Sequence, residues 1–218
     1  MGVGHAAVAL SASQIAPRIN VGLLIFAAFF ADFLLGIFAA VGLEHAHVPP
    51  DFAFHHYLTF TFPYSHGLTA LLLWGILLGA LLSRFSPRNG KRAFVLIVAL
   101  VLSHFLLDAL VHVPELPLLG EDSPKLGLAL WNHLPLELLL ETAMAVVGIS
   151  LFWRVGNSRA GRIGITVFVL LLTGLTWTQL WMTKPVSSSQ LIVSWMVMPV
   201  LFAAIPYLID RKRVSLQR

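Results

Sequence analysis

Three polar residues lie one helical turn apart in an otherwise apolar segment. His104, Asp108 and His112 are spaced at i, i+4 and i+8 within residues 101–115. At about 3.6 residues per turn, their side chains fall on one face of a helix. An imidazole and a carboxylate at this spacing can bind the same metal ion. The flanking residues are too apolar to solvate an unpaired charge, so Asp108 needs a compensating group from another element.

Other candidate ligands lie at a similar height in neighbouring segments. Counting about 1.5 Å per helical residue from the nearest basic residue places them in one layer, roughly 18–27 Å from the basic end. The layer contains His5, Asp32, His66, His104, Asp108, Glu137 and Glu141 and no Lys or Arg. Four carboxylates without a cationic side chain require a bound metal cation, protonation or a water-filled cavity. The mixture of imidazoles and carboxylates favours zinc or another transition ion over calcium or magnesium.

The segments that position these residues are typical of an integral membrane protein. Of the 218 residues, 58% are hydrophobic and only 11% are charged, whereas an ordinary soluble domain is about a quarter charged. Cysteine is absent, which excludes disulfides, thiolate nucleophiles and iron–sulfur ligation. The pI near 9.9 would suit a nucleic-acid-binding protein, but the basic residues are distributed as membrane topology requires. We therefore expect the lipid bilayer as a partner, and no nucleic acid.

Six apolar segments are each long enough to cross about 30 Å of hydrocarbon. They cover residues 19–43, 64–83, 93–113, 134–154, 163–183 and 190–209. In a six-span topology, all Lys and Arg residues except Lys125 and Lys184 lie on one side. The positive-inside rule then places both termini in the cytoplasm and loops 44–63, 114–133 and 184–189 outside.

We predict a single all-α transmembrane domain covering residues 1–218. It comprises a short N-terminal helix at 1–17, the six-span bundle at 19–209 and a basic cytoplasmic tail at 210–218. Residues 2–16 are too short to span the bilayer, so they form either an interfacial helix or a half-span that doubles back at Pro17. This stretch lacks the basic region of a signal peptide, and we expect it to stay on the mature protein. The oligomeric state is left open.

Several short motifs contain these candidate residues. They are Gly4-His5, Asp32, Pro63-Tyr64-Ser65-His66, and the runs 103–108, 112–118 and 125–132. Together they resemble the bacterial membrane-bound metal-dependent hydrolase-like family of inner-membrane proteins, over roughly residues 1–155. The resemblance implies a bacterial inner-membrane location and a metal site formed by His5, Asp32, His66, His104 and Asp108. One departure is Pro63-Tyr64, where many relatives carry a further basic or histidine residue.

The leading functional hypothesis is a metal-dependent hydrolase whose site opens to the extracytoplasmic half of the membrane. The five residues would hold one or two divalent ions, with zinc the best fit. Glu141 or Asp108 would accept the proton of the attacking water, and Glu141 is preferred to Glu137 by its depth. Burial in the outer leaflet favours an amphiphilic substrate such as a lipid ester, amide or phosphodiester.

Three other functions fit the same residues. Intramembrane carboxylates and histidines also form the ion or proton sites of transporters. His66 and His104 could be the axial ligands of a b-type haem. The polar layer could also be purely structural or regulatory, with His104 and Asp108 forming a hydrogen bond between packed helices. His112, at the outer interface, is expected at the rim of a pocket or in the outer shell of the site rather than as a ligand. A continuous polar path would favour transport, whereas a site open only outward, above a packed inner half, would favour an enzyme.

Overall fold

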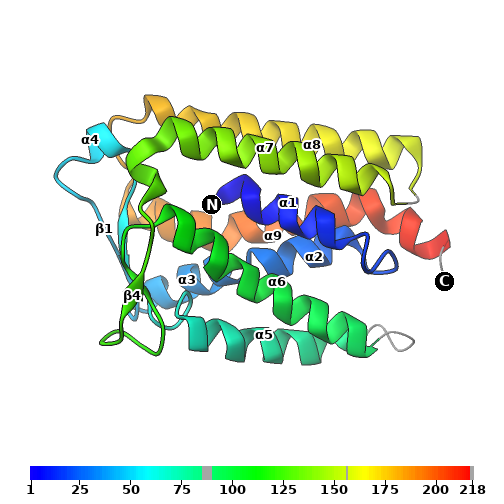
Figure 1. Cartoon of the computed structure of the whole chain (residues 1–218), viewed down its shortest axis with the longest axis horizontal. Helices are drawn as coiled ribbons and strands as arrows, with labels where there is room; N and C mark the ends of the chain where they lie inside the picture. Colours follow the sequence, from blue (N-terminus) through cyan, green and yellow to red (C-terminus); the bar gives the residue numbers. More distant parts are fainter. Residues whose placement is uncertain (85–89, 156, 217–218) are drawn as a thin grey trace.

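The computed structural model describes residues 1–84, 90–155 and 157–216, with side chains up to Arg211. Figure 1 shows the helices running roughly parallel to one long axis, with the short hairpins gathered at one end. The α-helices are α1 (Gly2–Ala12), α2 (Val21–Ala28), α3 (Phe30–Ala40), α4 (Phe52–His55), α5 (Leu68–Ser83), α6 (Gly90–Val111), α7 (Leu134–Trp153), α8 (Arg159–Trp177) and α9 (Ser188–Leu216). Two 3-10 helices, η1 (Leu130–His133) and η2 (Thr178–Trp181), adjoin α7 and α8. The predicted all-α class is confirmed, since strands occur only in the loops.

Two antiparallel hairpins organise the loops at this end. Strand β1 (His45–His47) pairs with β2 (Thr59–Thr61), with His45 opposite Thr61. Strand β3 (Leu116–Pro117) pairs with β4 (Lys125–Leu126). The first hairpin returns the chain after β2 to the position just before β1. Residues that are about 20 apart in the sequence therefore become neighbours there.

The number of membrane spans differs from the predicted six. Within the described residues, four helical stretches have the length and apolar character of a span: Gly90–Val111, Leu130–Trp153, Arg159–Trp181 and Ser188–Arg211. The predicted span 19–43 is two helices, α2 and α3, bent by 51°, and the pair would make a fifth span. The predicted span 64–83 is reduced to the 16 residues of α5 because the chain forms turns up to Gly67. Six spans are therefore not confirmed.

The short helix α1 lies inside the bundle rather than on its surface (Figure 1). It packs against α7, α2, α6 and α8, and Val3, Ala6, Ala9 and Leu10 are fully buried. This burial favours the half-span alternative over the interfacial helix. The contact with α7 depends on Gly148, because a Cβ atom there would lie only 2.8 Å from backbone atoms of Ala7.

Adding one methyl group at this contact is expected to destabilise the protein. Gly148→Ala would force α1 away from α7, and overpacking of this kind costs about 1–3 kcal/mol. Gly174→Ala is the matched control, because a Cβ on this glycine of α8 meets no atom within 4 Å. In detergent, the melting temperature should fall by several degrees in Gly148→Ala and stay the same or rise slightly in Gly174→Ala. Equal melting temperatures for the two variants would contradict the close packing of α1.

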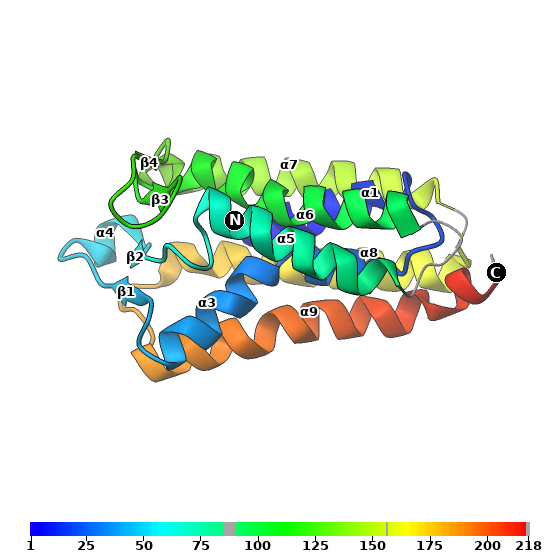
Figure 2. The same ribbon diagram turned by 90° about the horizontal axis from the view of Figure 1, so that it is seen from below.

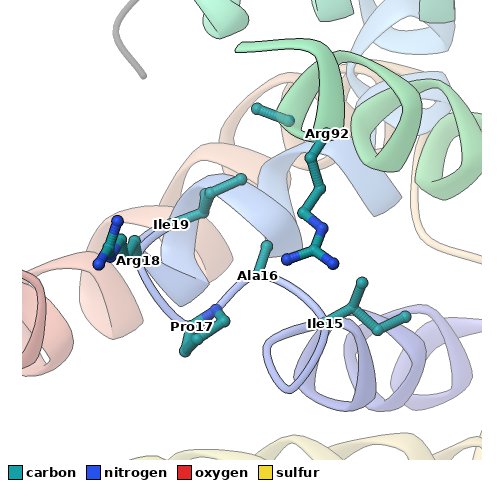
Figure 3. A pocket seen from close by; sticks show the side chains of 7 residues that line it. Ile15, Ala16, Pro17, Arg18, Ile19 and Arg92 are labelled. Carbon is teal, nitrogen blue, oxygen red and sulfur yellow. The ribbon is translucent and has the colours of Figure 1, made fainter. Parts of the chain in front are cut away.

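The end of the bundle opposite the hairpins carries basic residues and a cavity of about 340 Å³. Figure 3 shows that Arg92 points into this cavity towards Ile15 and Ala16, whereas Arg18 points the other way. Both arginines are exposed, so water can solvate their charges. This is the end that the positive-inside rule assigns to the cytoplasm. Arg88 and Arg218, and the side chains of Lys212 and Arg213 in the predicted basic tail, lie outside the described residues.

Candidate metal centre

The structure brings together all five residues that were predicted to bind metal. His5 comes from α1, Asp32 from α3, His66 from the turn before α5, and His104 and Asp108 from α6. They form two overlapping groups, His5–His104–Asp108 and Asp32–His66–His104, whose ligand atoms lie within 4.8 Å of one another. All are buried except Asp32, whose side chain is 27% exposed. These groups could hold a metal ion.

Asp108 lies at the centre of the cluster. Its Oδ1 is 3.1 Å from Nε2 of His5, and its Oδ2 is 3.1 Å from Nε2 of His104. Nε2 of His66 and Nε2 of His112 each lie 3.7 Å from Oδ2. The Nε2 atoms of His66 and His104 are 3.2 Å apart. Bonds of about 2.0–2.1 Å to a tetrahedral zinc imply roughly 3.3 Å between ligand atoms, so the shortest of these spacings fit such an ion.

Two of the histidines are held by hydrogen bonds on the side of the ring away from the cluster. Nδ1 of His104 donates to the carbonyl oxygen of Ala28 at 2.7 Å, beside the bend between α2 and α3. Because a carbonyl only accepts, Nδ1 carries the proton and Nε2 keeps its lone pair for the cluster. Nδ1 of His112 is likewise 2.6 Å from Oε1 of Glu115. This is the outer-shell arrangement that fixes metal-binding histidines in proteins.

His66 is held in the same way through a serine. Oε1 of Glu44 accepts from the backbone N–H groups of Tyr64 and Ser65, and Oε2 accepts from the Ser65 hydroxyl at 2.6 Å. In this arrangement the Ser65 oxygen accepts the Nδ1 proton of His66 at 2.7 Å, so Nε2 of His66 also keeps its lone pair. Burial raises the pKa of the Glu44 carboxyl above its ordinary value, while the hydrogen bonds from Ser65 and Tyr64 oppose that rise.

Sequence reasoning missed this supporting layer. Glu44 lies in loop 44–63, and its contact with Ser65 depends on the β1–β2 hairpin, so it has no local signal in the sequence. Ser65 showed no partner in the sequence for the same reason. The pair of His112 and Glu115 did have a signal in its i, i+3 spacing. His112, expected at a pocket rim or in the outer shell, lines the cavity and is buried, with its Nε2 3.7 Å from Oδ2 of Asp108.

Glu141, the predicted general base, contacts α1. Its Oε2 accepts from the backbone N–H of Val3 at 3.0 Å, and its Oε1 has no hydrogen-bond partner among the described residues. Glu141 and Glu137 are both buried, but neither lines the cavity at the cluster. Its contact with Val3 positions the start of α1, and a role in proton transfer stays a prediction.

The amino group of Met1 also reaches the cluster. It donates to Oδ1 of Asp108 at 2.9 Å. This single positive charge does not balance Asp32, Asp108 and the two glutamates of α7. The cluster therefore still requires protons or a cation. Unlike the other histidines of the cluster, His5 has no hydrogen-bond partner for its buried Nδ1 within the described part of the chain.

A cavity of about 370 Å³ leads to the cluster. Asp32, His66, Asp108 and His112 are the titratable side chains that line it. The remaining lining is mostly aromatic and aliphatic: Phe29, Leu35, Phe60, Phe62, Trp131, Leu175, Trp195, Met198, Pro199 and Phe202, with Met1, Gly2 and Ser194. Within the described residues, the lining contains no Lys or Arg.

The half of the bundle between the cluster and the basic end is packed with apolar side chains. On α6, Ile97, Leu100 and Val101 are buried between Arg92 and His104. Leu24 and Ile25 of α2, Leu10 of α1 and Phe152 of α7 are also fully buried. The cavity at the cluster has no lining residue from this half.

The fold and the site together define a class: a helical protein with apolar helices of membrane-spanning length and a buried His–Asp cluster that could hold a metal ion. No protein-family model, curated protein or solved structure matches this chain. The resemblance drawn from the motifs remains an expectation, and function has to be argued from the geometry.

Proposed function

We propose that the protein is a membrane-embedded, metal-dependent hydrolase that acts on an amphiphilic substrate from the extracytoplasmic half of the bilayer. The observation that carries this proposal is the orientation of three imidazoles. His66, His104 and His112 each have Nδ1 tied to an oxygen and Nε2 turned towards Asp108. Lone pairs that converge at such distances repel one another unless a cation or a proton lies between them.

Zinc is the ion that this donor set fits best, because it combines imidazole nitrogen with carboxylate oxygen and accepts few ligands. Nδ1 of His104 is occupied by its hydrogen bond to the carbonyl oxygen of Ala28, so only Nε2 can bind a metal and His104 can be a ligand of one ion. The two overlapping groups therefore share an ion through His104, or a second ion binds through the other oxygen of Asp108. When bound, the ion supplies Lewis acidity to the substrate oxygen and acidifies a water molecule.

The remaining role in hydrolysis, transfer of the proton of the attacking water, would belong to a carboxylate of the chain. Asp32 is the carboxylate of the site most open to the cavity, with its side chain 27% exposed against 3% for Asp108. It is therefore better placed than Glu141 to take the proton of the attacking water. In ester hydrolysis, the water oxygen bonds to the carbonyl carbon, the bond from that carbon to the alkoxy oxygen breaks, and the leaving oxygen receives the proton.

We further propose a multi-pass arrangement in a bacterial inner membrane, with the basic end of the bundle and the C-terminus in the cytoplasm. The predicted cytoplasmic N-terminus does not fit this structure, because α1 doubles back and the Met1 amino group is buried at Asp108. The basic residues at the end shown in Figure 3 support this orientation. The cavity at the cluster then lies in the outer half of the bilayer. A six-span count requires α2 and α3 to act as one bent span and the short α5 to cross a locally thinned bilayer.

The alternatives fit the geometry less well. A transporter needs a polar path through the membrane, whereas buried apolar side chains separate the cluster from the basic end. A haem with His66 and His104 as axial ligands needs space for a porphyrin between them. Their Nε2 atoms are 3.2 Å apart, and Asp32 and Asp108 lie within 4 Å of both. A purely structural cluster would leave metal content and activity unaffected by changes at Asp108.

Removing the metal tests the proposed hydrolysis directly. The protein in lipid nanodiscs should hydrolyse a fluorogenic acyl ester, and a strong zinc chelator should reduce the rate at least about tenfold, because the attacking water would lose its activation. Adding zinc back should restore the rate. Protein carrying His45→Ala, a change at an exposed loop histidine, should respond like wild type. A hydrolysis rate that is insensitive to chelation, or absent in zinc-loaded protein, would contradict the proposal.

A further inference from the structure

One wall of the cluster cavity lies at the outside of the bundle. Leu175 of α8 lines the cavity although it is 54% exposed, and Ser194 and Met198 of α9 line it beside Leu175. Figures 1 and 2 show α8 and α9 running along the same axis, close together at the end with the C-terminus and further apart towards the hairpins. The surrounding surface of these helices is apolar, with Leu171 70% exposed. In a bilayer this seam would face lipid chains rather than water.

The charge of the lining restricts what can reach the cluster. Two carboxylates, Asp32 and Asp108, face the cavity. The described lining offers no Lys or Arg to bind a phosphate, and the amino group of Met1 is already hydrogen-bonded to Asp108. A phosphate monoester carries close to two negative charges near pH 7, so beside these carboxylates it would depend on the bound ion alone for compensation. An uncharged carbonyl linkage needs no such compensation. The aromatic and aliphatic remainder of the lining suits a hydrocarbon chain.

The part of α9 that lines the cavity contains a proline, which removes one backbone hydrogen bond of the helix. Pro199 lies in the lining, inside α9. Proline lacks an N–H group and removes one helical hydrogen bond, which permits a helix to bend at that point. The wall beside Met198 can therefore open with little loss of backbone hydrogen bonding.

We infer that the seam between α8 and α9 is a lateral entrance for an acyl lipid, whose uncharged ester or amide linkage is delivered to the cluster. This inference rests on the proposed hydrolase function and names its substrate class and entry route. The acyl chain lies along Leu175, Met198 and Phe202, and the carbonyl group lies at the Asp32 end of the cavity. A phosphodiester, which burial in the outer leaflet also allows, fits less well beside Asp32 and Asp108, because the described lining contains no Lys or Arg.

A large side chain placed in the seam between α8 and α9 tests whether the lipid enters there. Ser194→Trp fills the seam, and Val193→Trp is the matched control, because Val193 is its neighbour on α9, is 57% exposed and does not line the cavity. Both variants are reconstituted in nanodiscs with a neutral diacylglycerol that carries a diazirine in one acyl chain. Cross-linking to cavity residues is measured by mass spectrometry, and zinc content is measured in parallel. We expect at least fivefold less cross-linking in Ser194→Trp, unchanged cross-linking in Val193→Trp, and equal zinc in both.

The outcomes separate the inference from the function on which it rests. Unchanged cross-linking in Ser194→Trp would overturn the lateral entrance. Competition by unlabelled lipids tests the substrate class: neutral diacylglycerol should displace the probe at least tenfold better than phosphatidic acid, and equal or better displacement by phosphatidic acid would overturn it. Capture of the probe requires neither zinc nor hydrolysis. If cross-linking follows the expected pattern but no lipid is hydrolysed, the hydrolase fails while the lipid entrance stands.

Discussion

Asp108→Asn is expected to remove the bound metal from the purified protein. The substitution keeps the shape of the side chain but deletes the charge that four imidazoles approach within 3.1–3.7 Å. Elemental analysis of detergent-purified protein should show about one zinc ion per chain in wild type and less than roughly a tenth of that in the variant, because a structural or catalytic site of this kind depends on its charged ligand. His104→Ala should give the same loss by removing a shared ligand.

Loss of metal has to be separated from loss of the fold. His45→Ala changes an exposed histidine of β1 and should retain full zinc content. Size-exclusion profiles should show that Asp108→Asn remains monodisperse, since the amide can still accept the hydrogen bond from the Met1 amine. Stoichiometric zinc in well-folded Asp108→Asn and His104→Ala would show that the cluster is not a metal site. A wild-type protein without zinc would show the same.

Glu44→Gln and Ser65→Ala should each weaken zinc binding about 10–100-fold, as is usual when the outer-shell partner of a metal-binding histidine is removed. The two changes act differently. Ser65→Ala deletes the acceptor for Nδ1 of His66. Glu44→Gln can present its amide N–H to Ser65, which then donates to Nδ1 of His66 and leaves the proton on Nε2. A histidine in that tautomer cannot bind the metal through Nε2.

Competition with a chromophoric chelator measures this affinity directly. Ser189→Ala, a change of an exposed serine in the first turn of α9, is the control and should bind zinc like wild type. If Ser65→Ala and Glu44→Gln both bind zinc like wild type, then His66 is not a ligand or is not held by this chain of hydrogen bonds. The tautomer of His66 can also be measured directly. Nuclear magnetic resonance of protein with ring-labelled histidine should report a change of tautomer at His66 in Glu44→Gln.

The polar layer could be predicted from the sequence because helical geometry is regular. The spacing of His104 and Asp108 fixes their common face, and the count of residues from the basic end fixes their depth. The same count placed His5, Asp32 and His66 at a similar height, and the structure brings these residues together. The short helix before Pro17 was also visible as a segment, although its position was left open between two alternatives.

Helix length was predicted less well than helix position. The sequence shows how apolar a segment is, but it does not show where a continuous segment bends. Residues 19–43 are uniformly apolar, yet the helix is interrupted at Phe29. This interruption lies next to Ala28, whose carbonyl oxygen accepts the hydrogen bond from His104. The residues before α5 form turns instead of helix, and this shortens the predicted second span.

Composition and helical periodicity are sufficient to predict a helical chain with apolar segments of membrane-spanning length, and to place its histidines and carboxylates in one layer. These properties follow from composition and from the fixed rise of a helix. Which imidazole nitrogens face inward depends on contacts between distant parts of the chain. Ala28 holds His104, and Glu44 holds His66 through Ser65, by long-range contacts that no residue spacing encodes. The pair of His112 and Glu115 is the exception, because its i, i+3 spacing is visible in the sequence. The position of α1 against α7 likewise depends on a long-range contact, a close approach that only Gly148 permits.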